Sequence, residues 1–393
     1  MEQFFATCPR GLEMILVEEL RQLGAGKVHA VGGGVQFCGD ILLCYQVNLE
    51  SRIASRVLWQ VARADYHGEA DIYRIVHAVP WTDWFDGTRT IRVDVSATKS
   101  PLTSLNFVTL KIKDAVCDKI RQLSQHRPSV DTRNPDIPIQ GHLSDREFTL
   151  YLDTSGEPLF KRGQRLASGG APLRENLAAG ILRLAGWSPG IPLLDPMCGS
   201  GTVVIEAACM ALDILPGIGR HFAFEKLKKF DPDAWRELIR RRTARPKARV
   251  SLPIYGSDID GAVLKAARAN LAGAGLEQVV SLKRADVLEL TAPAKEGIIV
   301  SNPPYGVRLG EQQALAEFYP KLGDVLKKQF AGWRAYFLSA DMRLPKLIRL
   351  TTSKRTPLFN GALDCRLFEY KLIAGGMRKK KDQAKSISET PMT

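Results

Sequence analysis

Polar side chains that can hold a ligand stand directly after four short apolar segments in the C-terminal part of the sequence. Asp195 begins the run DPMCGSGT, and Asn302 begins the run NPPY. Asp258 and Asp260 follow PIYGS, and Asp286 follows VVSLKRA. Carboxylate and amide oxygens accept hydrogen bonds from the hydroxyl and amino groups of a ligand. A single aspartate after a strand is often only a helix cap, but four such positions in succession predict one binding site.

The glycine-rich run between residues 195 and 202 predicts a tight turn from a strand into a helix. Gly199 and Gly201 allow the backbone to approach a ligand closely beside the N-terminus of that helix. The dinucleotide-binding fingerprint requires a third glycine or alanine where Val204 stands, and the P-loop requires a lysine that this run lacks. Both of these nucleotide sites are therefore disfavoured, and so is a nicotinamide-dependent oxidoreductase.

The run NPPY offers hydrogen-bond acceptors and an aromatic ring that could bind a nucleobase. Two consecutive prolines remove two N–H donors, which leaves the carbonyl of Pro303 as an acceptor beside the side-chain oxygen of Asn302. Together these oxygens can hold an exocyclic NH₂ group by both hydrogens and direct its nitrogen at an electrophile. Tyr305 offers a flat face on which an extruded base can stack. The run therefore favours chemistry on the amino group of a nucleobase.

The elements expected around these motifs form two different patterns. From residue 193 onward, strands and helices alternate regularly, which predicts an open, mostly parallel sheet with helices on both faces. Ligands bind beyond the carboxyl ends of the strands in such sheets. The earlier part has an irregular α+β pattern, with a helix after Asp40, an amphipathic helix over 107–123 and a strand over 148–154.

The charge and composition of the chain limit the classes of binding partner and the cellular location to be expected. The 393 residues carry a net charge of +13, and residues 156–393 hold 38 Lys and Arg against 23 Asp and Glu. The excess is concentrated in residues 220–249, where it indicates an RNA-contacting helical excursion or merely a solvated helix face. No apolar run is long enough for a membrane helix, and no secretory leader is visible. Seven cysteines without a CxxC pair favour reduced thiols in the cytoplasm and no metal site.

The motifs at 195–202 and 302–305, with Asp258 and Asp286, resemble those of class I S-adenosylmethionine-dependent methyltransferases that act on amino groups. The stretch 162–182 resembles the linker of THUMP-domain RNA methyltransferases. In layout the chain is similar to RlmL-type 23S rRNA guanine-N2 methyltransferases. The resemblance implies three regions: a ferredoxin-like part at 1–44, a THUMP RNA-binding domain at 45–155, and a Rossmann-like methyltransferase domain with a seven-stranded, mostly parallel sheet at 156–376. The basic and polar residues at 377–393 predict a disordered tail.

The resemblance also implies roles for individual residues. The ribose of S-adenosylmethionine would be held by Asp258 and its adenine by Asp286, whereas the methionine part would lie at Asp195 and the glycine turn. The implied catalytic residues are Asn302, Pro303, Pro304 and Tyr305. The implied cofactor-binding residues are Asp195, Pro196, Met197, Gly199, Gly201, Thr202, Asp258, Ile259, Asp286, Val287 and Asn302. Some family members carry a second methyltransferase domain, which we do not expect here.

The expected reaction is direct in-line transfer of a methyl group to the N2 amine of a guanine in RNA, with 23S rRNA as the favoured substrate. No cysteine lies beside NPPY, so covalent catalysis is not expected, and Cys198 is interpreted as a small buried residue. Three alternatives stay open: a tRNA guanine-N2 enzyme, an N6-adenine or N4-cytosine methyltransferase, and a catalytically inactive RNA-binding or assembly factor. The sequence does not determine the oligomeric state.

Overall fold

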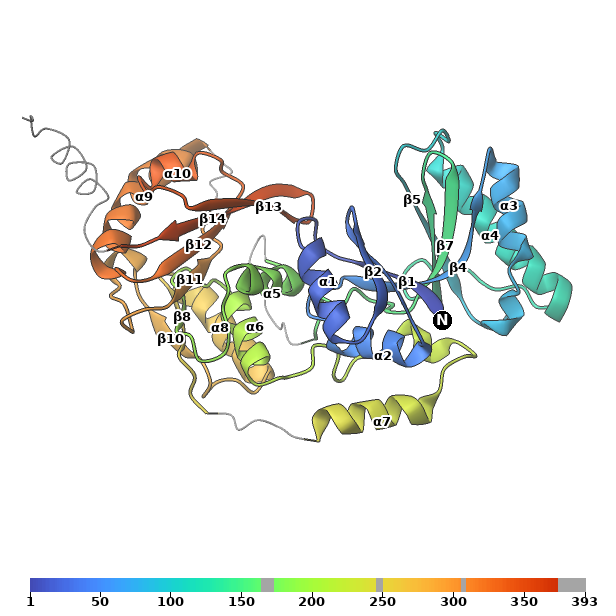
Figure 1. Ribbon diagram of the computed structural model, residues 1–393, viewed down its shortest axis with the longest axis horizontal. Helices are drawn as coiled ribbons and strands as arrows, with labels where there is room; N and C mark the ends of the chain where they lie inside the picture. The colour runs from blue at the N-terminus through green and yellow to red at the C-terminus, as the bar shows by residue number, and fades with distance from the viewer. Residues whose placement is uncertain (164–172, 245–249, 305–308, 374–393) are drawn as a thin grey trace, which may run out of the picture. The chain divides into compact units, whose positions relative to one another are not determined.

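The computed structural model describes residues 1–163, 173–244, 250–304 and 309–373 (Figure 1). The chain folds into two compact units. The first comprises residues 1–165, 174–180 and 209–248, and the second comprises residues 166–173, 181–208 and 249–393. Each unit is built on a sheet of seven strands. None of the helices in the described part of the chain is long and apolar enough to span a membrane.

The sheet of the first unit has the strand order β2-β3-β1-β4-β7-β6-β5. All neighbouring strands run antiparallel except β5 and β6, which run parallel. The irregular α+β pattern expected for this region is confirmed, although the sequence pattern missed β1, β2 and β6. The strands are β1 Glu2–Thr7, β2 Gly26–Val31, β3 Gly34–Gly39, β4 Arg56–Asp65, β5 Ile91–Ala97, β6 Ile137–Leu143 and β7 Glu147–Asp153, and the helices are α1 Glu13–Gln22, α2 Ile41–Glu50, α3 Glu69–Ala78, η1 Trp81–Asp83, α4 Leu105–Ser124, η2 Ala223–Lys226 and α7 Pro232–Thr243.

One face of this sheet is apolar and forms the core. Phe4 lies 5.3 Å from Phe37 and 5.4 Å from Trp59, measured between ring centroids. Gly141 of β6 is on the same face, where the side chain of Ile112 from α4 approaches within 2.9 Å of the position that a Cβ atom would take. Successive side chains of a strand point to opposite faces, so the intervening residues form a second face, which we call the polar face.

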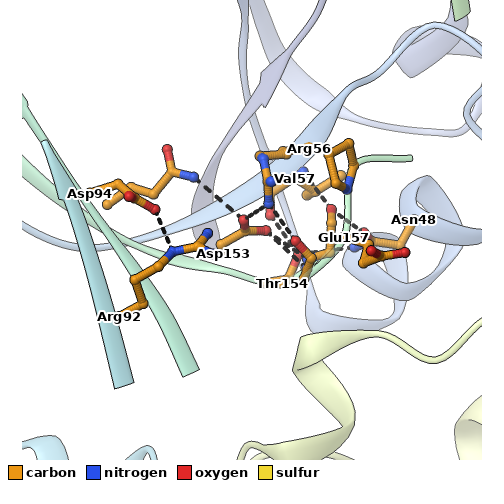
Figure 2. A network of polar contacts seen from close by, with 12 residues as sticks. Asn48, Arg56, Val57, Arg92, Asp94, Asp153, Thr154 and Glu157 are labelled. Atoms are coloured by element: carbon orange, nitrogen blue, oxygen red, sulfur yellow. Dashed lines mark hydrogen bonds and ion pairs between the residues drawn. The ribbon is translucent and has the colours of Figure 1, made fainter. Parts of the chain in front are cut away.

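A buried polar network secures the end of β7 (Figure 2). Asn48 of α2 donates a hydrogen bond of 3.0 Å to the hydroxyl of Thr154, which donates in turn to the carbonyl of Val57 at 2.7 Å. Asp153 is paired with Arg56 at the start of β4. Burial raises the pKa of Asp153, and the charge of Arg56 opposes that increase. The network therefore joins α2, β4 and β7 through groups that would be costly to leave unpaired.

The basic segment predicted from the sequence packs within the first unit, although it interrupts the β/α pattern of the second. Tyr45 of α2 contacts Phe224 and Trp235 at centroid distances of 4.6 and 5.9 Å. The Tyr45 hydroxyl also accepts a hydrogen bond from the backbone N–H of Asp231. These contacts fix α7, which has no fully buried residue and exposes its basic side chains. The expected helical excursion is therefore present and anchored by aromatic rings.

The sheet of the second unit has the strand order β10-β9-β8-β11-β12-β14-β13. The five strands β10, β9, β8, β11 and β12 run parallel to one another, whereas β14 and β13 form an antiparallel hairpin at one side. This confirms the expected seven-stranded, mostly parallel sheet; the sequence pattern missed β13. The strands are β8 Leu193–Asp195, β9 Ile254–Asp258, β10 Ser281–Arg284, β11 Ile298–Ser301, β12 Arg334–Ser339, β13 Lys354–Asn360 and β14 Leu363–Lys371, and the helices are α5 Glu175–Leu184, α6 Thr202–Ala211, α8 Gly261–Gly273, η3 Val287–Glu289, α9 Leu309–Gln329 and α10 Leu344–Leu347.

Candidate active site

The four predicted polar positions lie in a row at one edge of the second sheet. Because β10, β9, β8 and β11 are neighbours and run parallel, their carboxyl ends meet at the same edge. Asp195 and Asp258 are the last residues of β8 and β9, Asn302 directly follows β11, and Asp286 stands two residues beyond β10. The order along the edge is Asp286, Asp258, Asp195, Asn302, which differs from the chain order because β8 lies in the middle of the sheet.

Asp195 is almost completely buried, with 2% of its surface exposed. Its Oδ1 atom accepts hydrogen bonds from the Ser301 hydroxyl at 2.7 Å and from the Met197 backbone N–H at 3.3 Å. Burial raises the pKa of this carboxyl to about 7, and the nearby Asp258 adds to the increase. A cationic group placed beside Asp195 would favour its ionised form, so the environment suits an ammonium ligand.

The glycine turn after β8 has the conformation that its sequence predicts. Gly199 and Gly201 have positive φ angles of 51° and 86°, which L-residues with side chains rarely adopt. A Cβ atom on Gly201 would lie 3.3 Å from the Cβ of Ala267, whereas one on Gly199 would meet nothing within 4 Å. The turn therefore packs closely on α8 at Gly201 and leaves open space at Gly199. Thr202 begins α6.

Asp258 is held by backbone groups on both sides. Its Oδ2 atom accepts from the Gly199 N–H at 2.9 Å, and its Oδ1 atom accepts from the Asp260 N–H at 3.0 Å. Each carboxylate oxygen has a second lone pair, so two ligand hydroxyls can still be accepted. The neighbouring Ile259 exposes 61% of its surface. Asp260 has a structural role instead, because its carboxylate caps α8 through the Ala262 N–H at 2.7 Å.

The side chains of Asp286 and Val287 both make contacts within the protein. Asp286 caps η3, with its Oδ1 atom accepting from the Leu288 N–H at 2.9 Å. The side chain of Val287 is buried in the hydrophobic core with Tyr319. A contact of Val287 with a ligand would therefore involve its main chain, and the adenine role of Asp286 stays a prediction.

The NPPY run follows β11, and Tyr305 lies outside the described residues. Asn302 is half-buried, Pro303 is buried and Pro304 is exposed. The carbonyl of Pro304 accepts a hydrogen bond of 2.8 Å from the hydroxyl of Tyr319, which is only 1% exposed. Tyr319 thus ties the run to α9.

Sequence reasoning missed Tyr319, although the sequence held a signal for it. Leu315, Tyr319, Leu322 and Leu326 follow helical spacing, and a tyrosine on an apolar helix face needs a partner for its hydroxyl. Burial raises the pKa of Tyr319, and the negative charge of Asp341 raises it further. The hydroxyl therefore stays protonated and can donate to Pro304.

Cys198 is confirmed as a small buried residue. It exposes 6% of its surface, and its backbone N–H donates to the Ser257 carbonyl at 2.9 Å. Burial raises the pKa of its thiol far above the normal value, so a thiolate nucleophile is not available at neutral pH. All seven cysteines are free and buried. In the part of the chain that the structure describes, no three His, Cys, Asp or Glu residues are grouped as metal ligands.

Three family profiles match the chain and together cover most of it. Residues 162–369 match the profile described as RMKL-like, methyltransferase domain. Residues 66–153 match the THUMP domain, and residues 3–58 match the RlmL ferredoxin-like domain.

Whole-chain comparisons agree with the profiles. The chain is 40% identical over 370 residues to a Synechocystis protein, slr0064, which carries the provisional name of an RNA methyltransferase; the match covers 94% of this chain and 96% of that protein. It is 38% identical over 408 residues to the ribosomal RNA large subunit methyltransferase K/L of Aeromonas hydrophila, covering 99% of this chain and 57% of the relative. The chain therefore spans about half the length of that relative.

Solved structures show the same architecture. SMU.472, described as a methyltransferase and crystallised with SAH, is 29% identical with a TM-score of 0.86, and the match covers 95% of this chain and 99% of that one. A Listeria monocytogenes structure described as a predicted N6-adenine-specific DNA methylase is 29% identical with a TM-score of 0.85, covering 94% and 96% of the two chains.

The parallel sheet, its row of polar strand ends and its glycine turn define a methyltransferase of class I. Within that class, the profile over residues 162–369 and the full-length relative show that the chain belongs to the RMKL-like methyltransferase family.

Proposed function

We propose that this chain transfers a methyl group from S-adenosylmethionine to the exocyclic N2 amine of a guanine in RNA, with 23S rRNA as the substrate. The observation that carries the proposal is the placement of Asp258, Asp195 and Asn302 along one sheet edge, in a chain that belongs to the RMKL-like family. The ribosomal RNA methyltransferase name of the K/L relatives supports the choice of RNA.

The residues at this edge fit S-adenosylmethionine, the methyl donor, whose sulfonium supplies an electrophilic methyl group. The ammonium group of its methionine part suits the buried carboxylate of Asp195. The open space at Gly199 gives room beside the turn. The oriented carboxylate of Asp258 can accept the two ribose hydroxyls, and the exposed side chain of Ile259 offers an apolar surface for the adenine. Asp286, Pro196, Met197, Thr202 and Val287 complete the proposed cofactor set.

Asn302 and Pro303 orient the target amine in this proposal. The Asn302 side-chain oxygen and the Pro303 carbonyl each accept a hydrogen bond from one N–H of the amine. These two hydrogen bonds point the nitrogen at the methyl group. Pro304 stiffens the run, and its carbonyl is held by Tyr319. The proposed role of Tyr305 is to stack on the flipped base. Much of the rate acceleration then comes from positioning, and no strong general base is needed, since the methylated nitrogen loses its proton readily.

RNA binding is supported by the basic surface of the first unit. The helix α7 exposes Arg236, Arg240 and Arg241, and the THUMP match covers residues 66–153. Cationic side chains on one exposed helix suit the phosphates of a polynucleotide. The cytoplasm, where ribosomal RNA is found in bacteria, is the proposed location.

A second candidate is methylation of an adenine N6 amine. The likeness to the Listeria structure favours it, because the description of that structure names adenine and DNA. The same pair of acceptors at Asn302 and Pro303 can hold any exocyclic amine, so the polar edge does not by itself select the base. A guanine N2 in tRNA is the corresponding alternative for the RNA.

The deciding experiment compares nucleosides after methylation. The purified chain is incubated with S-adenosylmethionine carrying a deuterated methyl group and with total RNA from cells that lack the protein. The RNA is digested and analysed by mass spectrometry. Labelled N2-methylguanosine in 23S rRNA supports the proposal. Labelled N6-methyladenosine, or N2-methylguanosine confined to tRNA, would replace it with the corresponding alternative, and no label in any RNA would contradict it.

A further inference from the structure

The polar face of the first sheet contains a pocket of about 500 Å³. Its floor consists of Phe5 from β1, Leu58 from β4 and Tyr151 from β7. The sheet register brings these side chains to one face, because Phe5 is directly opposite Leu58 and Tyr151 is directly opposite Gln140 of β6. The pocket therefore has an apolar floor drawn from several strands.

The rim of this pocket is rich in groups that both donate and accept hydrogen bonds. Gln36, Gln140 and His142 stand around the floor. Burial lowers the pKa of His142, so its ring is neutral at pH 7, and its Nδ1 atom lies 3.0 Å from the Ser96 hydroxyl. The acidic residue in the lining, Glu147, is paired with Arg63 at 2.6 Å. An apolar floor that holds two aromatic rings, with uncharged amide and imidazole groups beside it, matches a nucleobase, which is apolar on its faces and polar at its edges.

A second pocket, of about 450 Å³, continues the same face toward the start of β4. Pro138 lines this second pocket and Gln140 lines the first; they are two residues apart on β6 and therefore point the same way, about 7 Å from each other. The basic residues that line the second pocket are Arg56, Arg92, Arg133, Lys161 and Lys226, and its acidic residues are Asp136 and Glu157. We call this the cation-rich pocket.

The basic side chains of the cation-rich pocket form ion pairs with carboxylates but can still bind a phosphate. Arg56 is anchored by the buried carboxylate of Asp153, and Arg92 contacts Asp94 at 2.9 Å (Figure 2). Lys226 contacts Asp136 at 2.7 Å, with 41% of the lysine side chain exposed. Ion pairs this exposed contribute little to stability, so a phosphate can compete for the cation.

The segment that interrupts the methyltransferase fold supplies part of this pocket. His221, Phe222, Ala223 and Lys226 all line it, and they belong to residues 209–248, which pack within the first unit. The interruption therefore completes a surface on the first unit as well as carrying α7.

We infer that the polar face binds an unpaired RNA strand, with one base in the pocket floored by Phe5 and Tyr151 and the adjoining phosphates in the cation-rich pocket. The inference rests on the proposed function and adds to it the strand type and the surface. A base that is paired in a duplex cannot present its face to the pocket floor, whereas an unpaired base can.

The test measures binding of the full-length chain to a short fluorescein-labelled oligoribonucleotide of mixed sequence, alone and annealed to its complement, by fluorescence anisotropy over a range of salt concentrations. The first variant, Arg92→Ala/Arg133→Ala, removes two cations from the cation-rich pocket. Its matched control, Arg74→Ala/Arg121→Ala, removes two exposed arginines from α3 and α4, each paired to an aspartate three residues away. We expect the first variant to reduce the salt slope for the single strand by about 1.4 and the control to leave it unchanged.

The base pocket is tested by Phe5→Ala and by Gln140→Ala/His142→Ala. Loss of the stacking surface should weaken single-strand binding by about fivefold or more, with little effect on the duplex. If thermal melting shows that Phe5→Ala does not fold, the rim variant provides the test, with an expected loss of roughly three- to tenfold.

The outcomes separate this inference from the proposed function. If the wild-type chain methylates RNA but all polar-face variants bind the single strand as the control does, the inference is overturned and the proposed function stands. Equal affinity for duplex and single strand, with equal sensitivity to the variants, would also overturn it. If the single strand binds as expected but no RNA is methylated, the proposed function fails and the surface remains an RNA site.

Discussion

The two sheets of this chain present polar side chains in different ways. In the second unit, polar residues stand at the carboxyl ends of adjacent parallel strands, so the candidate active site lies along an edge. In the first unit, the strands are mostly antiparallel and the candidate RNA surface lies across a face, built from alternate residues such as Phe5, Leu58, Gln140 and Tyr151. An edge site uses contiguous residues after each strand, whereas a face site uses every second residue of several strands.

This difference has a consequence for chemistry and for binding. The turns at an edge place the main chain beside the candidate site, and hydrogen bonds fix it there: the Gly199 N–H donates to Asp258, and the Tyr319 hydroxyl donates to the Pro304 carbonyl. A face offers side chains over a wide area but few main-chain groups, since these are used in the sheet. We therefore expect substitutions at the edge to affect catalysis and those on the face to affect RNA affinity.

The largest effect should come from Asn302→Ala. Removing one of the two acceptors that orient the amine should lower kcat by about 100- to 1000-fold, because positioning and electrostatic stabilisation are lost together. Binding of S-adenosylmethionine, measured by calorimetry, should change only a few-fold. A variant that loses cofactor affinity but keeps kcat would show that Asn302 serves the cofactor and not the base.

Asp258→Ala should have the next largest effect, on cofactor affinity. Loss of two charge-assisted hydrogen bonds should weaken S-adenosylmethionine binding by roughly 10- to 1000-fold. Asp260→Ala is the matched control, since that carboxylate caps α8 and should cost about 1 kcal/mol of stability without changing the affinity. Equal affinities in the two variants would contradict the ribose role of Asp258.

Tyr319→Phe tests whether catalysis requires the main chain at Pro304 to be held in place by a hydrogen bond. The variant loses the hydrogen bond to the Pro304 carbonyl, so we expect kcat to fall roughly three- to tenfold with unchanged cofactor affinity. Tyr370→Phe is the control from the same hydrophobic core, because its buried hydroxyl has no partner among the described residues and its removal should leave both activity and stability intact. A similar kcat in both variants would exclude a positioning role for Tyr319.

An effect of similar size is the pH dependence set by Asp195. Its pKa of about 7 in the cofactor-free protein would be lowered by the ammonium group of the ligand, so affinity for S-adenosylmethionine should rise several-fold between about pH 6 and 7.5, below the range in which the ligand's own ammonium group loses its proton. Calorimetry across this range measures it. Asp195→Asn should abolish the pH dependence, and a wild-type affinity that falls with pH would contradict the assignment.

Asp195 also makes the free energy of unfolding of the cofactor-free protein depend on pH, but this contribution falls as the pH rises, whereas the affinity for the cofactor increases. Because the folded-state pKa of Asp195 lies above its unfolded value, the folded cofactor-free protein holds the proton more tightly between about pH 4 and 7. The contribution of Asp195 to the free energy of unfolding therefore decreases as the pH rises through that window. Comparison of thermal melting between wild type and Asp195→Asn isolates this contribution.

The sequence predicted the row of polar strand ends because each of these residues directly follows a short apolar segment in the chain. The run from Asp195 to Thr202 predicted the glycine turn, and the positions of Asp258 and Asn302 predicted a row at one edge. Tyr319 was missed because it is joined to Pro304 only through the fold. An aspartate after a strand is often a helix cap, and the structure shows that Asp286 forms such a cap.

The polar face could not be predicted in the same way. Its residues lie as far apart in the sequence as Phe5 and Tyr151, and β1, β2 and β6 were not recognised as strands at all. In β6, Pro138 and Gly141 hide the alternation, and the polar side chains of Gln140 and His142 look like those of a loop. Only the pairing register shows that Gln140 is opposite both Asp94 and Tyr151. The packing of residues 209–248 within the first unit is likewise a property of tertiary contacts.

A crystal of this chain soaked with S-adenosylhomocysteine provides the most direct test of the edge site. Our expectation is that the ribose hydroxyls bind Asp258, that the amino group lies beside Asp195, and that the side-chain amide of Asn302 faces the sulfur. A ligand bound away from the carboxyl ends of β8, β9 and β11, or an Asn302 side chain directed away from the sulfur, would contradict it.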